Sequence, residues 1–265
     1  MRIIMKIIKI LNRFLLIILI CFFIFLINGV FEHFVVQDRI FEFKSRATEE
    51  PVADPLIDNT YYYRVPSREG EDISRNIFNF NKRIIGAKAD IITSNRNPLR
   101  DYPFLSKLVG PFAKYLYLGH TSINSTEDGS RLIETIGNSA WENNIVREGN
   151  NDWLTKEEYG DYSSPMIIGL RIKDTTSEQR DRMIEYAKSK LGYHYNYSFL
   201  FNRANSFYCT DIVSRAASAG GVNVNYDFLA TTGTDILISE NVYIFFIREV
   251  VIENGIERYN IYYLD

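Results

Sequence analysis

The stretch Arg203–Gly221, RANSFYCTDIVSRAASAGG, places a cysteine where an irregular aromatic segment becomes a helical pattern. After Cys209 the apolar residues recur at a spacing that puts them on one helical face, namely at Ile212, Val213, Ala216 and Ala217. Gly220 and Gly221 follow and are typical of a helix C-terminus. The pattern therefore predicts a helix that begins at Cys209.

A cysteine in the first turn of a helix lies at the positive end of the helix dipole, which favours the nucleophilic thiolate. Asn205 or Ser206 could cap this helix. The other interpretation is an inert buried cysteine, and position alone does not decide between the two. Cys21, the second of two cysteines, lies in an apolar run, so the chain has no disulfide framework.

Only three histidines could serve a cysteine nucleophile as its base. His33 follows the N-terminal apolar run, and His194 lies in an aromatic segment typical of a loop. His120, in GHTSI, precedes a short β-prone run, so it has the rigid setting that a Cys-His pair requires. A single histidine beside a strand is more often structural, but His120 is the best candidate for the base.

A third group should orient the imidazole. The runs GHTSI and RLIETIG flank STEDGS, whose Asp-Gly pair predicts a hairpin turn. Glu134 lies on the returning strand, with apolar neighbours on both sides, and can be a neighbour of His120 on one face. A salt bridge at the rim of the sheet is the other interpretation of Glu134.

The rest of the body predicts an α+β fold with antiparallel strands around a few helices. SPMIIGLRI reads as a strand, and residues 241–264 read as two strands joined at Asn254-Gly255. TSEQRDRMIEYAKSKLG predicts a helix capped by Ser177. Its apolar stripe would consist of Met183, Ile184, Ala187 and Leu191.

The N-terminus has an apolar run, FLLIILICFFIFLI at residues 14–27, and the 18 residues from Phe14 to Phe31 carry no charge. This is long enough to cross roughly 30 Å of hydrocarbon as a helix, and it lacks the cleavage pattern of a signal peptide. Four upstream cations would keep the N-terminus cytoplasmic. The sequence thus predicts a membrane anchor at 1–31, a stalk at 32–83 and an extracytoplasmic, single-pass-anchored domain at 84–265.

The charge of the chain argues against one class of partner, nucleic acid. The chain of 265 residues has a net charge of −3, and setting aside the four N-terminal cations leaves 26 Lys and Arg against 33 Asp and Glu. A body with a net charge of −7 is a poor match for nucleic acid, whose phosphates require a basic surface. We therefore expect no nucleic-acid partner.

Several short motifs occur in a telling order: AKADIIT, GHTSI, LIET, LGYHYNYSF and FYCTDIVSRA. In this order they resemble the permuted branch of the NlpC-type papain-fold cysteine hydrolases, the YiiX-like group, in which histidine and glutamate precede the cysteine. The resemblance runs from about Ile84 to Ile247. Ala89 stands where the family commonly has glycine, and Thr210 where serine commonly follows the cysteine.

The resemblance implies a circularly permuted papain-like fold with Cys209 as nucleophile, His120 as base and Glu134 as the orienting group. It implies no cofactor and no metal. The implied function is a membrane-anchored hydrolase that cleaves the amide bond of a peptide or cell-wall peptide. A lipid-directed acyl hydrolase or acyltransferase of the same fold, an inactive binding module and a purely structural membrane-tethered protein remain as alternatives.

Overall fold

The computed structural model describes residues 2–95, 107, 119–137, 141–155, 166–198, 203–226 and 230–265. The long helices are α1 (Arg2–Ser45), α4 (Ser177–Lys188) and α5 (Cys209–Ala219), with the shorter α6 (Gly233–Ile238) and η1 (Trp141–Asn143). The strands are β1 (Val52–Ala53), β2 (Thr60–Val65), β3 (Phe78–Asn79), β4 (Ile84–Ile85), β5 (Ile91–Ser94), β6 (Thr121–Asn124), β7 (Arg131–Thr135), β8 (Val146–Asn150), β9 (Ile167–Ile172), β10 (His194–Tyr195), β11 (Ser206–Phe207), β12 (Val242–Glu253) and β13 (Ile256–Leu264).

A nine-stranded sheet with the order β1-β2-β13-β12-β9-β5-β6-β7-β8 organises the protein. Every residue of β5 and β9 is buried, because helices or loops cover both faces of the central strands. The protein is thus α+β, as the sequence predicts. The sheet is mixed, however, and not purely antiparallel, since β13 and β2 pair in parallel. The circularly permuted papain-like fold itself stays a prediction.

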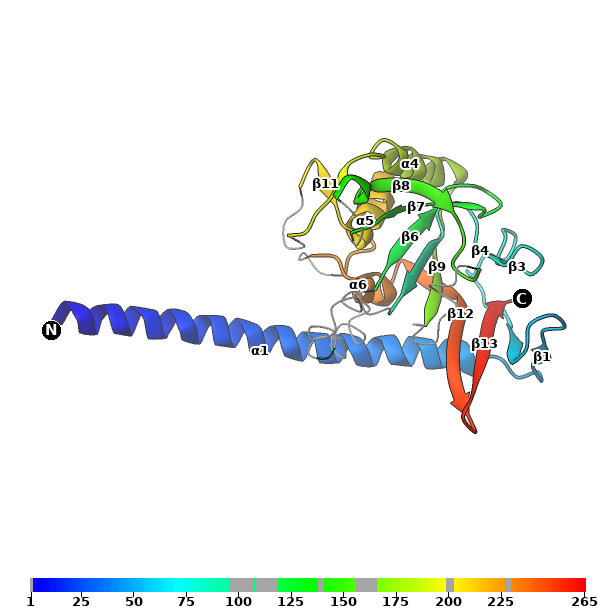
Figure 1. The fold of residues 1–265 in the computed structure, drawn as a ribbon, viewed down its shortest axis with the longest axis horizontal. Coiled ribbons are helices and arrows are strands. Elements are labelled where there is room, and N and C mark those ends of the chain that lie inside the picture. The colour runs from blue at the N-terminus through cyan, green and yellow to red at the C-terminus, as the bar shows by residue number, and fades with distance from the viewer. Residues whose placement is uncertain are drawn as a thin grey trace.

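Helices α4 and α5 lie against each other, and α5 covers β6 and β7 (Figure 1). The predicted stripe of α5 is fully buried, at Ile212, Val213, Ala216 and Ala217. Gly220 is its C-cap, as the paired glycines indicate. In α4 the cap is Thr176 and not Ser177, and the helix ends at Lys188. Leu191 therefore lies beyond the helix and is exposed, whereas the rest of its predicted stripe is buried.

Two predicted hairpins are present. Strands β6 and β7 pair so that Ser122 faces Glu134. Their turn requires Gly129, which has φ of 71° and whose Cβ, if present, would lie 2.0 Å from the carbonyl oxygen of Gly86. Strands β12 and β13 are joined at Asn254-Gly255, where both residues have positive φ, as a tight hairpin turn of type I′ requires.

The predictions of a membrane-spanning N-terminal helix and of a single-pass membrane protein are wrong. Within the described part of the chain, no helix combines the length and the apolar character that crossing a membrane requires. The apolar run is one part of α1, which continues beyond Phe31 to Ser45. Its later turns pack on the body through side chains that recur at helical spacing and are buried in the core, namely Val36, Ile40 and Phe43.

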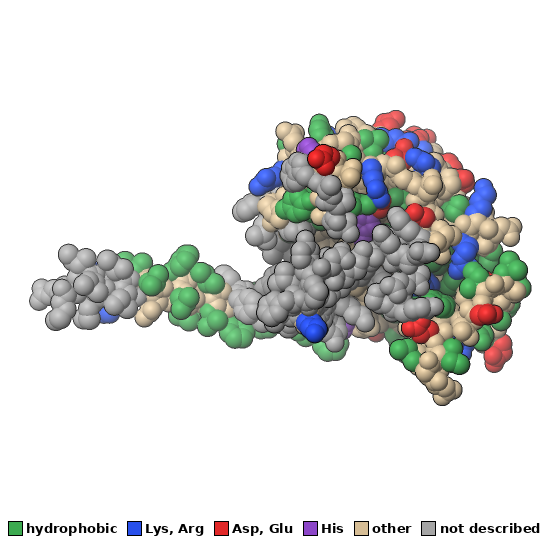
Figure 2. Space-filling model, viewed as in Figure 1, with side chains coloured by type: hydrophobic (Ala, Val, Ile, Leu, Met, Phe, Trp, Pro, Cys, Tyr) green, Lys and Arg blue, Asp and Glu red, His purple; other side chains and the backbone are tan. Residues whose placement is uncertain are grey.

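Residues 32–83, assigned to a stalk by the sequence, contribute β2 to the main sheet and Val65 to the core. The end of α1 lies beside α6 and β12, so part of this range is packed against the body (Figure 1). The first half of α1 projects away from the body and exposes large apolar side chains (Figure 2). The proposed division at residues 31 and 83 itself stays a prediction.

Candidate active site

Cys209 is the first residue of α5 and is half-buried. The N-cap is Tyr208, and neither Asn205 nor Ser206 caps the helix, since α5 has no side-chain cap hydrogen bond. The next residue, Thr210, donates a hydrogen bond of 2.5 Å from its hydroxyl to the carbonyl oxygen of Thr231. This buried bond fixes the start of the helix against a distant loop, so the position of the thiol is well defined.

His120 lies directly before β6, and its backbone is held by β5. Its carbonyl oxygen accepts a hydrogen bond of 2.9 Å from the amide of Ser94. The Nε2 atom of its ring lies 2.7 Å from Oε2 of Glu134, which comes from β7. Their side chains are only 16% and 9% exposed, so this contact is shielded from water. The predicted hairpin therefore joins the predicted base to the predicted orienting group.

The side chain of Cys209 interacts with the imidazole of His120 and helps to raise its pKa, so the three predicted residues lie together. Because Nε2 faces Glu134, Nδ1 is the ring nitrogen left for the thiol. Burial opposes the charged imidazole, but the interactions with Cys209 and Glu134 outweigh it and raise the pKa of His120 to about 9. The imidazole is therefore positively charged at neutral pH.

Glu134 has a second partner, Arg147 on β8, which the sequence reading missed. Nε and Nη2 of Arg147 lie 2.9 and 2.7 Å from Oε1 of Glu134. Burial works against the carboxylate, yet its bonds and charge interactions with His120 and Arg147 lower the pKa of Glu134 to about 2. The β8 run VREGN has charged residues at consecutive positions, so its pattern does not single out Arg147.

Aromatic rings surround the thiol and the imidazole. Trp153 stacks on His120 with ring centroids 5.5 Å apart, and its Nε1 donates a 2.9 Å hydrogen bond to Ser122 Oγ. Tyr195 lies near Cys209. Burial raises the pKa of this tyrosine above its usual value, and the charge of Cys209 raises it further. Tyr208, the N-cap residue of α5, is buried, with 4% of its surface exposed. The stacked ring of Trp153 limits how the imidazole can turn.

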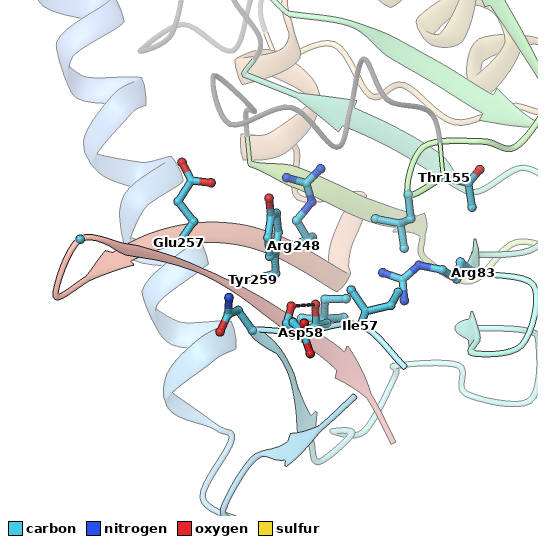
Figure 3. Close-up of a pocket in the computed structure, with 12 residues that line it drawn as sticks. Ile57, Asp58, Arg83, Thr155, Arg248, Glu257 and Tyr259 are labelled. Atoms are coloured by element: carbon cyan, nitrogen blue, oxygen red, sulfur yellow. Dashed lines mark hydrogen bonds between the residues drawn. The ribbon is translucent and has the colours of Figure 1, made fainter. Parts of the chain in front are cut away.

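The other two histidines lie elsewhere. His33 belongs to α1, and His194 is an exposed residue of β10. A cavity of about 790 Å³ also lies away from the three residues, at the β2, β12 and β13 part of the sheet (Figure 3). Its wall includes Arg83 and Arg248 but also acidic side chains, so its charge favours no ligand of either sign.

In the ranges that the structure describes, no group of three or more His, Cys, Asp and Glu side chains is placed to hold a metal ion. The interactions around Cys209 instead run from Cys209 to His120, from His120 to Glu134 and from Glu134 to Arg147.

Comparison with known proteins adds one neighbour. No protein-family profile matches the sequence, and no curated protein does. In structure the chain is similar to the metalloprotein yiiX (DUF1105) from Escherichia coli O157:H7, with 15% sequence identity and a TM-score of 0.44. The likeness covers 60% of this chain and 95% of the neighbour.

Proposed function

We propose that the protein is a cysteine hydrolase that cleaves an amide bond, in a peptide or cell-wall peptide, through a thioester on Cys209. The observation that carries the proposal is the continuous contact from Cys209 through His120 to Glu134. A nucleophile bonded to a base, which is in turn oriented by a third group, is the arrangement that covalent acyl transfer needs.

The first half-reaction follows from the charges. With the imidazole protonated, Cys209 reacts as the thiolate and its sulfur attacks the carbonyl carbon of the amide. The backbone amide of Cys209, in a helix start without a side-chain cap, is a donor for the developing oxyanion. His120 then gives its proton to the departing amine, and a thioester remains on Cys209.

The second half-reaction restores the thiol. Neutral His120 takes a proton from water, and the resulting hydroxide attacks the thioester carbon. The C–S bond breaks, the acid leaves, and the thiolate and imidazolium pair re-forms. Glu134 transfers no proton in this scheme. It holds Nε2 of the imidazole and stabilises the charged form of the ring.

The test is acyl trapping on the full-length chain. Wild-type protein and Cys209→Ala are incubated with cell-wall peptides and, separately, with membrane lipid extract, quenched in acid and mapped by mass spectrometry. We expect a peptidyl mass on the tryptic fragment that contains Cys209, lost on mild hydroxylamine treatment. A fatty-acyl mass there would replace the amide substrate with a lipid, and no adduct together with turnover by Cys209→Ala would refute the proposal.

A further inference from the structure

The geometry points to Arg147 as a positioning residue of the proposed active site, which holds the Glu134 carboxylate so that one oxygen faces His120. This inference rests on the proposed function for its catalytic consequence. The expected effect of its charge falls on His120 and Glu134 alone. That effect is a change in the pKa of His120, which can be measured without a substrate.

The sheet register gives Arg147 its place. Glu134 is the direct cross-strand partner of Ser122 on β6 and of Arg147 on β8. Partners in such a row project on the same face of a sheet, and His120, two residues before Ser122, shares that side. The backbone therefore lines up the imidazole, the carboxylate and the guanidinium across three neighbouring strands.

The guanidinium leaves one carboxylate oxygen for the imidazole. Both Nε and Nη2 of Arg147 bind Oε1, whereas Oε2 lies 2.7 Å from Nε2 of His120. Two donors on one oxygen fix the plane of the carboxylate, which a single bond would leave free to rotate. Arg147 thus determines which Glu134 oxygen His120 meets, without touching the thiol itself.

Charge gives the same residue a second effect. The carboxylate of Glu134 lies between the imidazolium of His120 and the guanidinium of Arg147, so Arg147 offsets the buried negative charge of Glu134. Without Arg147, His120 is the remaining hydrogen-bond partner of this carboxylate within the described residues. The carboxylate would then hold the imidazolium proton more strongly. A less acidic imidazolium is a poorer proton donor to the leaving group.

A simple edge-strand salt bridge would have a different signature. Such a pair contributes little to stability, and its loss would lower stability slightly without altering the pKa of the imidazole. Arg131 supplies the matched control, because it lies on the same strand pair and donates a 3.1 Å hydrogen bond to Oδ1 of Asn150, outside the row.

The experiment is an NMR titration of ¹³C-histidine-labelled, full-length protein. We compare wild type with Arg147→Met, Arg147→Lys and Arg131→Met, and we assign His120 by its loss in His120→Ala. The wild-type midpoint is expected near the pKa of about 9. It should rise by about half a pH unit or more in Arg147→Met, by less in Arg147→Lys, which keeps the charge, and not at all in Arg131→Met.

An unchanged or lower His120 midpoint in Arg147→Met would overturn the inference. Arg147→Gln, which keeps amide donors but no charge, should give the same upward shift and replaces Arg147→Met if that variant does not fold. With substrate, Arg147→Met should lower kcat about tenfold and leave KM near the wild-type value. Turnover by Cys209→Ala would refute the proposed function, whereas the titration would still decide the role of Arg147.

Discussion

Two clusters of buried charge lie on neighbouring strands and differ in where they end. In the first, Nε and Nη2 of Arg171 on β9 lie 2.9 and 2.6 Å from the two oxygens of Asp90, and both side chains are fully buried. Arg171 also donates to the carbonyl oxygens of Asp72 and Asn76, and Asp90 accepts from the amide of Ala87. Each of these bonds joins one part of the scaffold to another.

The second cluster, Glu134 with His120 and Arg147, ends at a thiol on one side and at a guanidinium that is 42% exposed on the other. A reacting group that approaches the thiol can therefore interact with the charges of this cluster. The charges of the Asp90 cluster contact only other parts of the scaffold. Burial of an ion pair does not by itself indicate a site. The difference lies in whether the chain of contacts reaches a nucleophile.

The largest effect should come from the end of the second cluster. Cys209→Ala removes the attacking sulfur, and His120→Ala removes the proton donor and acceptor. We expect either change to abolish turnover almost completely, and the double variant to lose no more than either one, because members of a catalytic unit act together. The measurement is the initial rate of turnover of the substrate class that acyl trapping on Cys209 identifies. Independent, additive losses would break the contrast with the structural cluster.

Glu134→Gln should have the next largest effect. It keeps the size and an acceptor oxygen but removes the charge that stabilises the imidazolium. By analogy with the acid of serine triads, we expect kcat to fall by up to about 10⁴-fold, and the remaining activity should stay above that of Cys209→Ala. The titration midpoint of His120 should fall. Wild-type activity in Glu134→Gln would show that another group orients His120.

Asp90→Asn tests the structural cluster. It leaves the fully buried Arg171 without its carboxylate, so we expect a loss of about 3 to 5 kcal/mol in the free energy of unfolding, measured with urea. The alkylation rate of Cys209 by iodoacetamide in the folded fraction should stay near that of wild type. A large change in that rate at small cost in stability would mean that the two clusters are coupled.

Local sequence patterns anticipated the parts of this arrangement that depend on neighbours along the chain. The helix starting at Cys209 and the β6 and β7 hairpin follow from an apolar stripe and an Asp-Gly turn. His120 and Glu134 could be paired because one short turn joins their strands. The approach of Cys209, 89 residues from His120, came only from the order of motifs, since no local rule predicts a contact of that span.

Long-range pairing explains what was missed. Arg147 reaches Glu134 through the β7 and β8 register, and register is not readable from either strand alone. The parallel pairing of β2 with β13 joins residues almost 200 positions apart. The continuation of α1 was masked by the apolar run before it, although Val36, Ile40 and Phe43 recur at the spacing of a helix that packs on a core.

The smallest predicted effect is on stability, and its sign differs on the two sides of neutrality. The folded-state pKa of His120 is raised from 6.5 to about 9, so its contribution is fully present below pH 6.5 and is lost as pH rises through about 9. The pKa of Glu134 is lowered from 4.5 to about 2, so its contribution is present above pH 4.5 and is lost as pH falls toward about 2.

Both contributions are complete only between about pH 4.5 and 6.5, and they describe one ion pair, so they are not added. A shift of this size corresponds to about 3 kcal/mol. We therefore expect urea unfolding at pH 9.5 to show a lower free energy than at pH 6, by up to about that amount. His120→Ala should lose most of this difference, whereas Asp90→Asn should keep it, because only the second cluster contains a group that titrates there. An equal pH dependence in wild type and His120→Ala would show that the imidazolium adds nothing to folding, and the contact between His120 and Glu134 would then act in catalysis alone.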